Sequence, residues 1–352
     1  MMIKKRITIL FTSIGGGLAP LVIKLLKNSD FFEYNVVGVD ANASCESAYF
    51  CDSFYQVPYG DTIEYIHKML TISKSNNVDV ILPGSDEEAL NLSANKGKFS
   101  LIGTEIAVAD NEILSLIANK INFYKKLEEN EIFVPTWHVV TNKQEINSIL
   151  ESYERKNLPC VIKPSRGRGS RGVYLIYPNE NPIDRNDLSG REKRLNYREF
   201  YSTRTEYDDD KRLYPSIVMD LIPGAIYDID ILSSAGKPIH ILPRKRIDPS
   251  FPNSGHILFR EQKFIELAEK LISIFKLDCL MDIDVMIDNN GRLCILEVNP
   301  RQSGSVSVGI TAGVPLIDDL IKSIFGLKID KISEYPNSLK VIPYKALEIF
   351  DA

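Results

Sequence analysis

The sequence lacks several features that mark common protein classes. Its five cysteines, at positions 45, 51, 160, 279 and 294, form no Cys-x-x-Cys pair, and several lie inside apolar runs. We therefore expect reduced core residues and no cysteine metal site. No apolar stretch approaches the roughly 18 residues that a membrane helix requires, so we expect no membrane partner. We also find no internal repeat.

Excess positive charge is missing as well. The chain of 352 residues has a formal net charge of −5, which argues against a broad nucleic-acid-binding surface. The basic start, MMIKKRITILFTS, has only a short apolar run and no small-residue cleavage site, so we expect a strand, not a signal peptide, and a cytoplasmic protein. A hydrophobic content of 44% is enough for two or three domains with ample core.

Strand and helix patterns alternate from residue 1 to about residue 105. The segments 6–13 and 35–41 read as strands, and 18–28 and 62–76 read as helices. Residues 78–95 read as a further strand, turn and helix. This βαβαβ order predicts a parallel, doubly wound sheet.

The rest of the chain mixes elements without this alternation. Residues 111–131 are predicted to form one long helix, and 262–276 have a clean apolar helix face. The polar segment 178–214 shows no periodicity, so we interpret it as an excursion outside the core. Further strands are predicted at 136–140, 159–164, 216–222, 226–233, 238–247, 279–288 and 292–300, and a further helix at 144–156.

A glycine turn, SIGGG, follows the first predicted strand, and Asp40 ends the second. The turn is similar to a dinucleotide fingerprint, but its glycine spacing is not Gly-x-Gly-x-x-Gly. Tight turns between strand and helix need glycine for structural reasons alone. We therefore rank an NAD-dependent dehydrogenase last among the functional interpretations.

A basic glycine-rich loop begins after Lys163, in the stretch VIKPSRGRGSRGV. It holds three glycines (167, 169 and 172) and three arginines (166, 168 and 171). Backbone amides of such a loop cradle phosphate oxygens, and a lysine adds a point charge. A flexible turn is the alternative, but it needs neither the arginines nor Lys163. Lys120 is a second candidate cation, although alone it reads as a solvated helix lysine.

An acidic hairpin is predicted around Asn290-Gly291. Period-two alternation puts Asp282 and Asp284 on one face of the first strand, and Glu297 and Asn299 on one face of its partner. Asp284 can then lie near Glu297, where a cation such as Mg²⁺ would offset their repulsion. A solvated polar strand face is the alternative, although these strands are otherwise apolar.

In this order, the motifs resemble the ATP-grasp superfamily, most closely its carbamoyl-phosphate-synthase-like and amino-acid-ligase (carboxylate–amine ligase) branch. The resemblance covers roughly residues 5–328 and rests on the glycine turn, Asn119-Lys120, the glycine-rich loop, VMDLIPGAIYDID and CILEVNPR. It implies an α/β and α+β fold, with an N-terminal Rossmann-like pre-ATP-grasp domain and two α+β subdomains that clasp ATP. The implied segments are 1–105 for the first domain, 106–215 for the linker helix and lid subdomain (loop 165–172, excursion 178–214), 216–328 for the C-terminal subdomain with the metal site, and 329–352 for a tail.

The resemblance also implies roles for individual residues. The implied ATP contacts are Lys120, Lys163, Ser165, Gly167, Gly169, Ser170, Asp220, Leu221, Ile222 and Asp228. The implied metal ligands are Asp284, Glu297 and Asn299, and the implied catalytic residues are Lys163, Arg246 and Arg301. Asp220 stands where the family usually has an adenine-binding glutamate, and Ile226 stands where it usually has a ribose-binding one. Arg244 and Arg246 match a region that often faces substrate, with a surface pair as the alternative.

The activity implied is an ADP-forming ligase that uses ATP and Mg²⁺, with Mn²⁺ as a substitute. A small-molecule carboxylate would become an acyl phosphate, and an amine or related nucleophile would displace the phosphate. Two alternatives stay open, namely a small-molecule kinase of the same fold and a nucleotide-binding protein without turnover. Substrates are the expected partners, without nucleic acid, and a homodimer is common among relatives.

Overall fold

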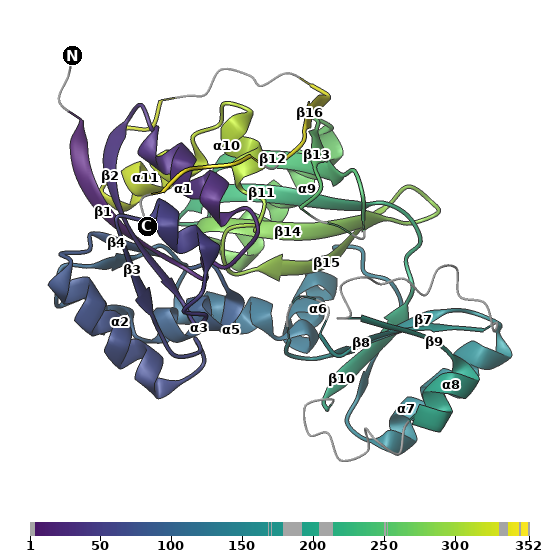
Figure 1. Ribbon diagram of the computed structural model, residues 1–352. Coiled ribbons are helices and arrows are strands. Elements are labelled where there is room, and N and C mark those ends of the chain that lie inside the picture. Colours follow the sequence, from purple (N-terminus) through teal and green to yellow (C-terminus); the bar gives the residue numbers. More distant parts are fainter. Residues whose placement is uncertain are drawn as a thin grey trace. The chain divides into compact units, whose positions relative to one another are not determined.

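The computed structural model describes residues 4–167, 169, 171–178, 192–203, 214–249, 251, 253–330, 337–344 and 346–350 (Figure 1). By its internal packing the chain divides into two compact units. Unit 1 comprises Met1–Ser115, Tyr227–Asp284 and Val298–Ala352, and unit 2 comprises Leu116–Ile226 and Val285–Glu297. The four segments implied by the resemblance remain a proposal about the domains.

Unit 1 contains the predicted parallel sheet. Its strand order is β3-β2-β1-β4-β5, and every neighbouring pair is parallel, as the alternating pattern predicted. The strands are β1 (Lys5–Thr12), β2 (Phe32–Asp40), β3 (Ser53–Gln56), β4 (Val80–Leu82) and β5 (Glu105–Ile106). The helices of this region are α1 (Ala19–Lys27), the 3-10 helix η1 (Glu46–Phe50), α2 (Ile63–Ser75), α3 (Asp86–Ala94), α4 (Lys96–Ser100) and α5 (Asn111–Ala118).

A six-stranded sheet has the order β15-β14-β11-β12-β13-β16 (Figure 1). Its strands are β11 (Ile226–Ser234), β12 (Lys237–Arg246), β13 (His256–Leu258), β14 (Cys279–Ile287), β15 (Leu293–Asn299) and β16 (Leu339–Val341). The helices here are α9 (Gln262–Phe275), α10 (Ser307–Thr311) and α11 (Leu316–Ile324). The antiparallel pairing of β11 with β12 sets Asp228 opposite Arg244, which matters for the site below. β16 lies in the predicted C-terminal tail and extends this sheet.

One hydrophobic core joins the parallel sheet to the six-stranded sheet within unit 1. It contains Ile7, Ile9 and Phe11 of β1 and the apolar face of α1, together with Leu242 of β12 and Leu320 of α11. Alternation along β1 sends every second side chain to this core, which is why a strand pattern at the N-terminus buries so much apolar surface. The N-terminal region therefore packs as part of unit 1.

Unit 2 holds a five-stranded sheet of order β6-β10-β7-β8-β9. Its elements are α6 (Lys120–Glu129), β6 (Trp137–Val140), α7 (Lys143–Arg155), β7 (Cys160–Pro164), β8 (Val173–Tyr177), β9 (Glu192–Asn196), α8 (Tyr197–Thr203) and β10 (Ser216–Asp220). Side chains of α7 and α8 pack with the strands into one core. Figure 1 shows these two helices on the same side of the sheet.

The interpretation of 178–214 as an excursion is wrong for residues 192–203. These residues form β9, which pairs in parallel with β8, and α8, whose Tyr197 and Phe200 are buried in the core of unit 2. The strand carries charged side chains and the helix is only seven residues long, so neither gives a readable period. Residues 179–191 and 204–213 lie outside the described part of the chain.

The single helix predicted for 111–131 is also wrong, because the structure has α5 and α6 with Asn119 between them. Asn119 adopts an extended conformation, and its side chain accepts hydrogen bonds from the backbone N–H groups of Ile121 and Asn122. An asparagine that caps the next helix ends the previous one, and apolar periodicity does not reveal this. The break makes Lys120 the first residue of α6.

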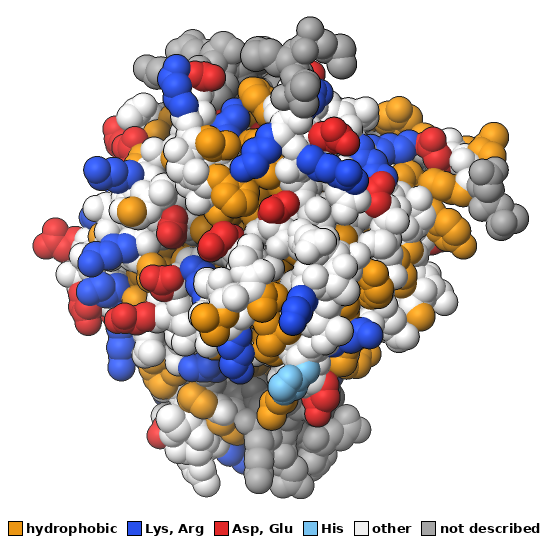
Figure 2. Space-filling model, turned by 90° about the vertical axis from the view of Figure 1, so that its left-hand side faces the viewer, with side chains coloured by type: hydrophobic (Ala, Val, Ile, Leu, Met, Phe, Trp, Pro, Cys, Tyr) orange, Lys and Arg blue, Asp and Glu red, His pale blue; other side chains and the backbone are white. Residues whose placement is uncertain are grey.

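Other expectations from composition can be checked directly. All five cysteines are free, and four of them are buried. No helix among the described residues is long and apolar enough to cross a membrane. On the face drawn in Figure 2, acidic and basic side chains are interspersed, as the near-balanced composition suggested.

We predict that Asp319→Asn destabilises unit 1 by about 3 kcal/mol, because Lys322 would lose its buried counter-charge. Asp319 is 1% exposed, accepts a 2.8 Å hydrogen bond from Lys322 and lies 2.7 Å from Nε2 of His240. Burial would raise the pKa of Asp319, but the hydrogen bonds from His240 and Lys322 outweigh it and lower that pKa. A lowered carboxyl pKa stabilises the fold above the unfolded-state value, and this contribution disappears as pH falls through the folded-state value.

Urea unfolding at neutral pH and across the acid range measures this effect. The difference between wild type and variant should shrink below about pH 4, the range in which aspartates protonate. Asp330→Asn is the matched control, because Asp330 pairs with Lys328 at the exposed surface and should change stability by less than about 0.5 kcal/mol. Equal effects of the two substitutions would contradict the prediction.

Candidate active site

In unit 2, Lys120 connects the glycine-rich loop to a predicted metal ligand. Its Nζ donates a 3.0 Å hydrogen bond to the carbonyl of Gly167 and lies 3.2 Å from Oε2 of Glu297. Its backbone N–H donates to the carbonyl of Ser165 at 2.8 Å. Only 7% of Lys120 is exposed, so it is not the solvated helix lysine of the alternative interpretation. The Asn119 break places this lysine against the loop.

The other predicted residues of the loop lie around β7. Lys163 is half-buried on β7 opposite Ile217 of β10, and Ser165 is buried directly after the strand. Gly167 and Gly169 have positive φ values of 150° and 54°, a backbone region that glycine enters at low cost. Ser170 lies outside the described residues.

Asp220, the predicted adenine contact, ends β10 in unit 2. Its Oδ1 accepts a 2.7 Å hydrogen bond from the hydroxyl of Tyr153, and its Oδ2 accepts one from the backbone N–H of Thr136 at 3.2 Å. Leu221 and Ile222 follow in a half-buried loop. The structure thus fixes the orientation of this carboxylate, and the predicted contacts of all three residues with the base remain a proposal.

The predicted hairpin turn is present between β14 and β15. The N–H of Gly291 donates to the carbonyl of Asp288 at 3.0 Å, and Gly291 has a φ of 78°. The carboxylate of Asp288 accepts hydrogen bonds from the backbone of Asn290 and Arg292, which tightens the turn. The turn fixes which residues of the two neighbouring strands face the same side, whereas the proximity of Asp284 to Glu297 stays a prediction.

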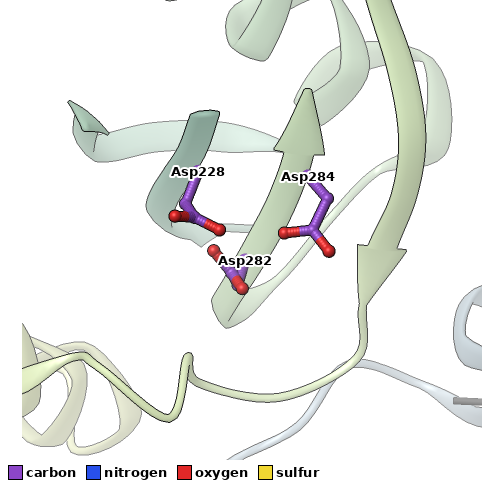
Figure 3. Close-up of side chains that lie close together, drawn as sticks. All are labelled: Asp228, Asp282 and Asp284. Atoms are coloured by element: carbon purple, nitrogen blue, oxygen red, sulfur yellow. The ribbon is translucent and has the colours of Figure 1, made fainter. Parts of the chain in front are cut away.

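Three aspartates converge in unit 1, as Figure 3 shows. Asp228 of β11 and Asp282 and Asp284 of β14 each offer a carboxylate oxygen, and these oxygens all lie within 4.8 Å of one another. Asp228 was predicted to contact ATP, Asp284 to bind metal, and Asp282 to share a strand face with Asp284. The side chain of Asp284 is the most accessible of the three at 16%, whereas those of Asp228 and Asp282 are buried.

Arg244 neutralises much of this acidic charge from inside the protein. The side chain is 0% exposed, so neither the surface alternative nor a solvent-facing substrate contact describes it. Its guanidinium donates to both carboxylate oxygens of Asp230, at 2.8 and 2.9 Å, and to Oδ1 of Asp282 at 3.3 Å. It also donates to the hydroxyls of Ser303 at 2.8 Å and Ser305 at 2.7 Å. The two protons of Nη2 are shared among three of these acceptors, namely Asp230, Asp282 and Ser303.

Arg246, predicted to be catalytic, binds the outer part of the same cluster. Its guanidinium donates to both oxygens of Asp228 and, at 2.9 Å, to Oδ1 of Asp284. Nε2 of His256 lies 3.2 Å from Asp228. The arrangement gives the predicted metal ligand Asp284 a cationic partner that belongs to the protein.

These contacts shift the pKa values of the cluster in opposite directions. Burial raises the pKa of Asp282 to about 7, and the charge of Asp228 adds to the increase. Burial acts on Asp228 in the same sense, but Arg244 and Arg246 outweigh it and hold its pKa well below the ordinary value. Burial lowers the pKa of His256, so this imidazole is neutral at pH 7.

Arg301 follows β15 and is held in place by the N-terminal end of α3. Its Nε lies 3.0 Å from Oδ1 of Asp86, and its Nη1 donates to the carbonyl of Gln302. Asp86 is the first residue of α3, where a carboxylate is favourable. The predicted catalytic arginine is thus positioned by the N-terminal region of unit 1.

The glycine turn of the N-terminal sheet has a structural explanation. The N–H of Gly15 donates to Oδ2 of Asp40 at 2.7 Å. A Cβ on Gly15 would lie 3.0 Å from that oxygen, so a side chain there would crowd the contact. Asp40 therefore closes the turn, in agreement with the structural interpretation of these glycines.

The sequence reasoning missed the residues that support the site. Asp230, His256, Ser303 and Ser305 were not singled out, and all four contact Arg244. For Asp230 the sequence did contain a signal. It alternates with Asp228 on a predicted strand, and period two directs both carboxylates to one side. The serines stand in the small-residue stretch after Arg301, which carries no such signal.

The oxygen donors suit a hard divalent cation. Asp284 and Asn299 of unit 1 offer carboxylate and amide oxygens, the donors that Mg²⁺ prefers, and Glu297 of unit 2 offers another carboxylate. In unit 1 the four carboxylates of Asp228, Asp230, Asp282 and Asp284 face two guanidinium groups, so the ionised cluster keeps a charge of −2. A divalent cation would balance that charge.

Two family models match the chain. Residues 212–347 match "ATP-grasp in the biosynthetic pathway with Ter operon", and residues 9–107 match the "PylC-like, N-terminal domain". The first match contains β11, β12, β14 and β15, which carry the carboxylates and arginines described above. The second covers the parallel sheet.

Individual relatives agree with these models. The arginine-specific carbamoyl phosphate synthase large chain of Bacillus subtilis is 22% identical over 286 residues, which are 77% of this chain and 25% of that protein. This chain thus spans about a quarter of the first curated relatives that it matches.

Two solved structures share the fold over most of their length. N5-carboxyaminoimidazole synthetase from Staphylococcus aureus, complexed with ADP, has a TM-score of 0.67 and 16% identity over 97% of this chain and 81% of its own. The biotin carboxylase–beta-gamma-ATP complex from Campylobacter jejuni has a TM-score of 0.68 and 15% identity over 92% of this chain and 72% of its own. The family models thus show an ATP-grasp domain at residues 212–347 and a PylC-like N-terminal domain at residues 9–107, and the two solved structures share the fold of this chain.

Proposed function

We propose that the protein is an ADP-forming ATP-grasp ligase that joins a small-molecule carboxylate to an amine or related nucleophile. The observation that carries the proposal is the position of Lys120. This one buried cation contacts both the glycine-rich loop, at Gly167, and the predicted metal ligand Glu297. Phosphate, metal and loop would meet at such a point in a phosphoryl-transfer site. The two similar structures are complexes with ADP and with beta-gamma-ATP, which supports ATP as the nucleotide.

The chain's own residues would have distinct tasks in this reaction. Lys120, Lys163 and the amides of the loop would hold phosphate oxygens, and Asp284, Glu297 and Asn299 would hold Mg²⁺, with Mn²⁺ as a substitute. The metal would supply charge neutralisation at the transferred phosphoryl group. Arg301, fixed by Asp86, would meet the phosphate of the activated substrate. The loop would exclude water, which hydrolyses acyl phosphates.

The proposed reaction has two steps. A carboxylate oxygen attacks the γ-phosphorus, the bond to the β-phosphate oxygen breaks, and ADP leaves. The nucleophile then attacks the carbonyl carbon of the acyl phosphate, loses a proton and displaces phosphate. Both steps require positioned cations more than covalent help from the protein.

A coupled ADP-release screen of amino acids and other small carboxylates, singly and in pairs, tests the activity. ADP release that needs both a carboxylate and an amine supports the ligase. A stable phosphorylated product without an amine identifies a kinase, and ATP binding without any ADP release identifies a protein without turnover. Gel filtration in the same buffers tests whether the protein is a homodimer.

We predict that Glu297→Ala reduces substrate-dependent ADP release by about 1,000-fold, because it removes a metal ligand and the partner of Lys120. Lys163→Ala should have an effect of the same order through the phosphate contact. The control is Glu129→Ala, since Glu129 pairs with Lys126 on the exposed face of α6. Circular dichroism should show folded protein in all three variants, and turnover like wild type in Glu297→Ala or Lys163→Ala would refute the site.

We also predict that Asp220→Ala weakens ATP binding about tenfold, as expected when one hydrogen bond of about 1.4 kcal/mol to the base is lost. Tyr153→Phe is the matched control, because it removes the 2.7 Å hydrogen bond to Asp220 but keeps the carboxylate. Calorimetric titration with ATP and with GTP gives the measurement. An equal loss of affinity in both variants, or an equal loss for both nucleotides in Asp220→Ala, would argue against an adenine contact.

A further inference from the structure

We propose that Asp282 is a positioning residue that sets which way the amide of Asn299 faces, so that its oxygen and not its nitrogen is presented to the metal. The inference rests on the proposed function, in which Asn299 binds the metal. The amide Nδ2 of Asn299 donates to Oδ2 of Asp282 at 3.3 Å. Both residues are buried: 6% of Asn299 and 4% of Asp282 is exposed.

The orientation of an amide matters because only one of its ends binds a hard cation. An asparagine side chain has a donor NH₂ on one branch and an acceptor oxygen on the other. When Asp282 accepts from Nδ2, the oxygen Oδ1 is directed away from Asp282. The reverse orientation would aim NH₂ protons at the cation, which repels them.

Asp282 can accept in this way because Arg244 holds its other oxygen. Nη2 of Arg244 donates to Oδ1 of Asp282 at 3.3 Å, while Asn299 uses Oδ2. The same guanidinium fixes Ser303 and Ser305, just beyond Asn299. A continuous chain of donors and acceptors therefore runs from Arg244 through Asp282 to Asn299, and both carboxylate oxygens are needed.

Asp282→Asn tests this arrangement, because the variant keeps the shape but has one acceptor for two donors. Either Arg244 loses its contact or Asn299 turns its amide over. We expect the affinity for Mn·AMP-PNP to fall about tenfold, the size typical of groups that support metal ligands, with unchanged affinity for AMP-PNP in EDTA. Calorimetry in an alkaline buffer, in which carboxyls are ionised, gives both values without turnover.

Asp230→Asn is the matched control. Like Asp282, Asp230 is buried and accepts from Arg244, in its case through both oxygens. Unlike Asp282, it has no hydrogen bond to Asn299 among the described residues. Both variants should lose thermal stability, and only Asp282→Asn should lose the metal-dependent part of the affinity. The proposal would be overturned if Asp282→Asn left the ratio of Mn·AMP-PNP affinity to AMP-PNP affinity unchanged. It would also be overturned if Asp230→Asn lowered that ratio equally.

The double variant Asp282→Asn/Asn299→Asp provides a rescue. The amide introduced at position 282 would accept from Arg244 and donate to the carboxylate introduced at position 299, whose second oxygen faces the metal. The single variant Asn299→Asp puts two carboxylates together and should bind Mn·AMP-PNP more weakly than the double variant. If Asp282→Asn does not fold, the comparison of the double variant with Asn299→Asp tests the proposal instead. A double variant that binds Mn·AMP-PNP no more tightly than Asn299→Asp overturns the proposal.

Asn299→Ala separates this inference from the proposed function. If it leaves the Mn·AMP-PNP to AMP-PNP affinity ratio unchanged, Asn299 is not a metal ligand and the proposed site fails. If it lowers the ratio while Asp282→Asn does not, the metal site stands and only the positioning role of Asp282 is overturned.

Discussion

The buried guanidinium of Arg244 is the interaction on which the rest of the site depends. A charge without solvent contact costs several kcal/mol unless partners satisfy it, and here Asp230, Asp282 and two serine hydroxyls do so. These partners come from β11, β14 and the loop after β15, so one side chain ties three segments together. Lysine could not replace it, because an ammonium has three donors and no planar fork.

The charge balance of the cluster explains why its members behave differently. Asp228 is flanked by both arginines and stays ionised, whereas burial and the nearby charge of Asp228 raise the pKa of Asp282. Asp284 is the most accessible carboxylate and has Arg246 as its partner. A group at the edge of a compensated cluster can exchange its partner at a lower cost than a group at the centre. This graded burial separates the structural carboxylates from the one suited to a ligand.

Much of the fold was readable from the sequence because it depends on periodic apolar patterns. The parallel sheet and the hairpin around Gly291 follow from alternation and turn chemistry. The break at Asn119 and the elements β9 and α8 did not, since a side-chain cap and a short charged strand give no periodic signal. The sequence indicates a role for Arg244, but its burial depends on partners 12 to 61 positions away, which no local pattern records.

Unit 2 also contains a carboxylate that is paired with a cationic side chain of the protein. Glu297 has Lys120 as its cationic partner, just as Asp284 has Arg246 in unit 1. Each carboxylate that the family resemblance assigns to the metal is thus already neutralised by a side chain of the protein. A cation that used either carboxylate would share it with that side chain or displace it, at a cost in Coulomb energy. Bound phosphates would lower this cost, because they offer the displaced lysine or arginine a new anionic partner. Under the proposed function, metal affinity and phosphate affinity would therefore be linked through Lys120 and Arg246, and this linkage would favour joint binding of metal and nucleotide.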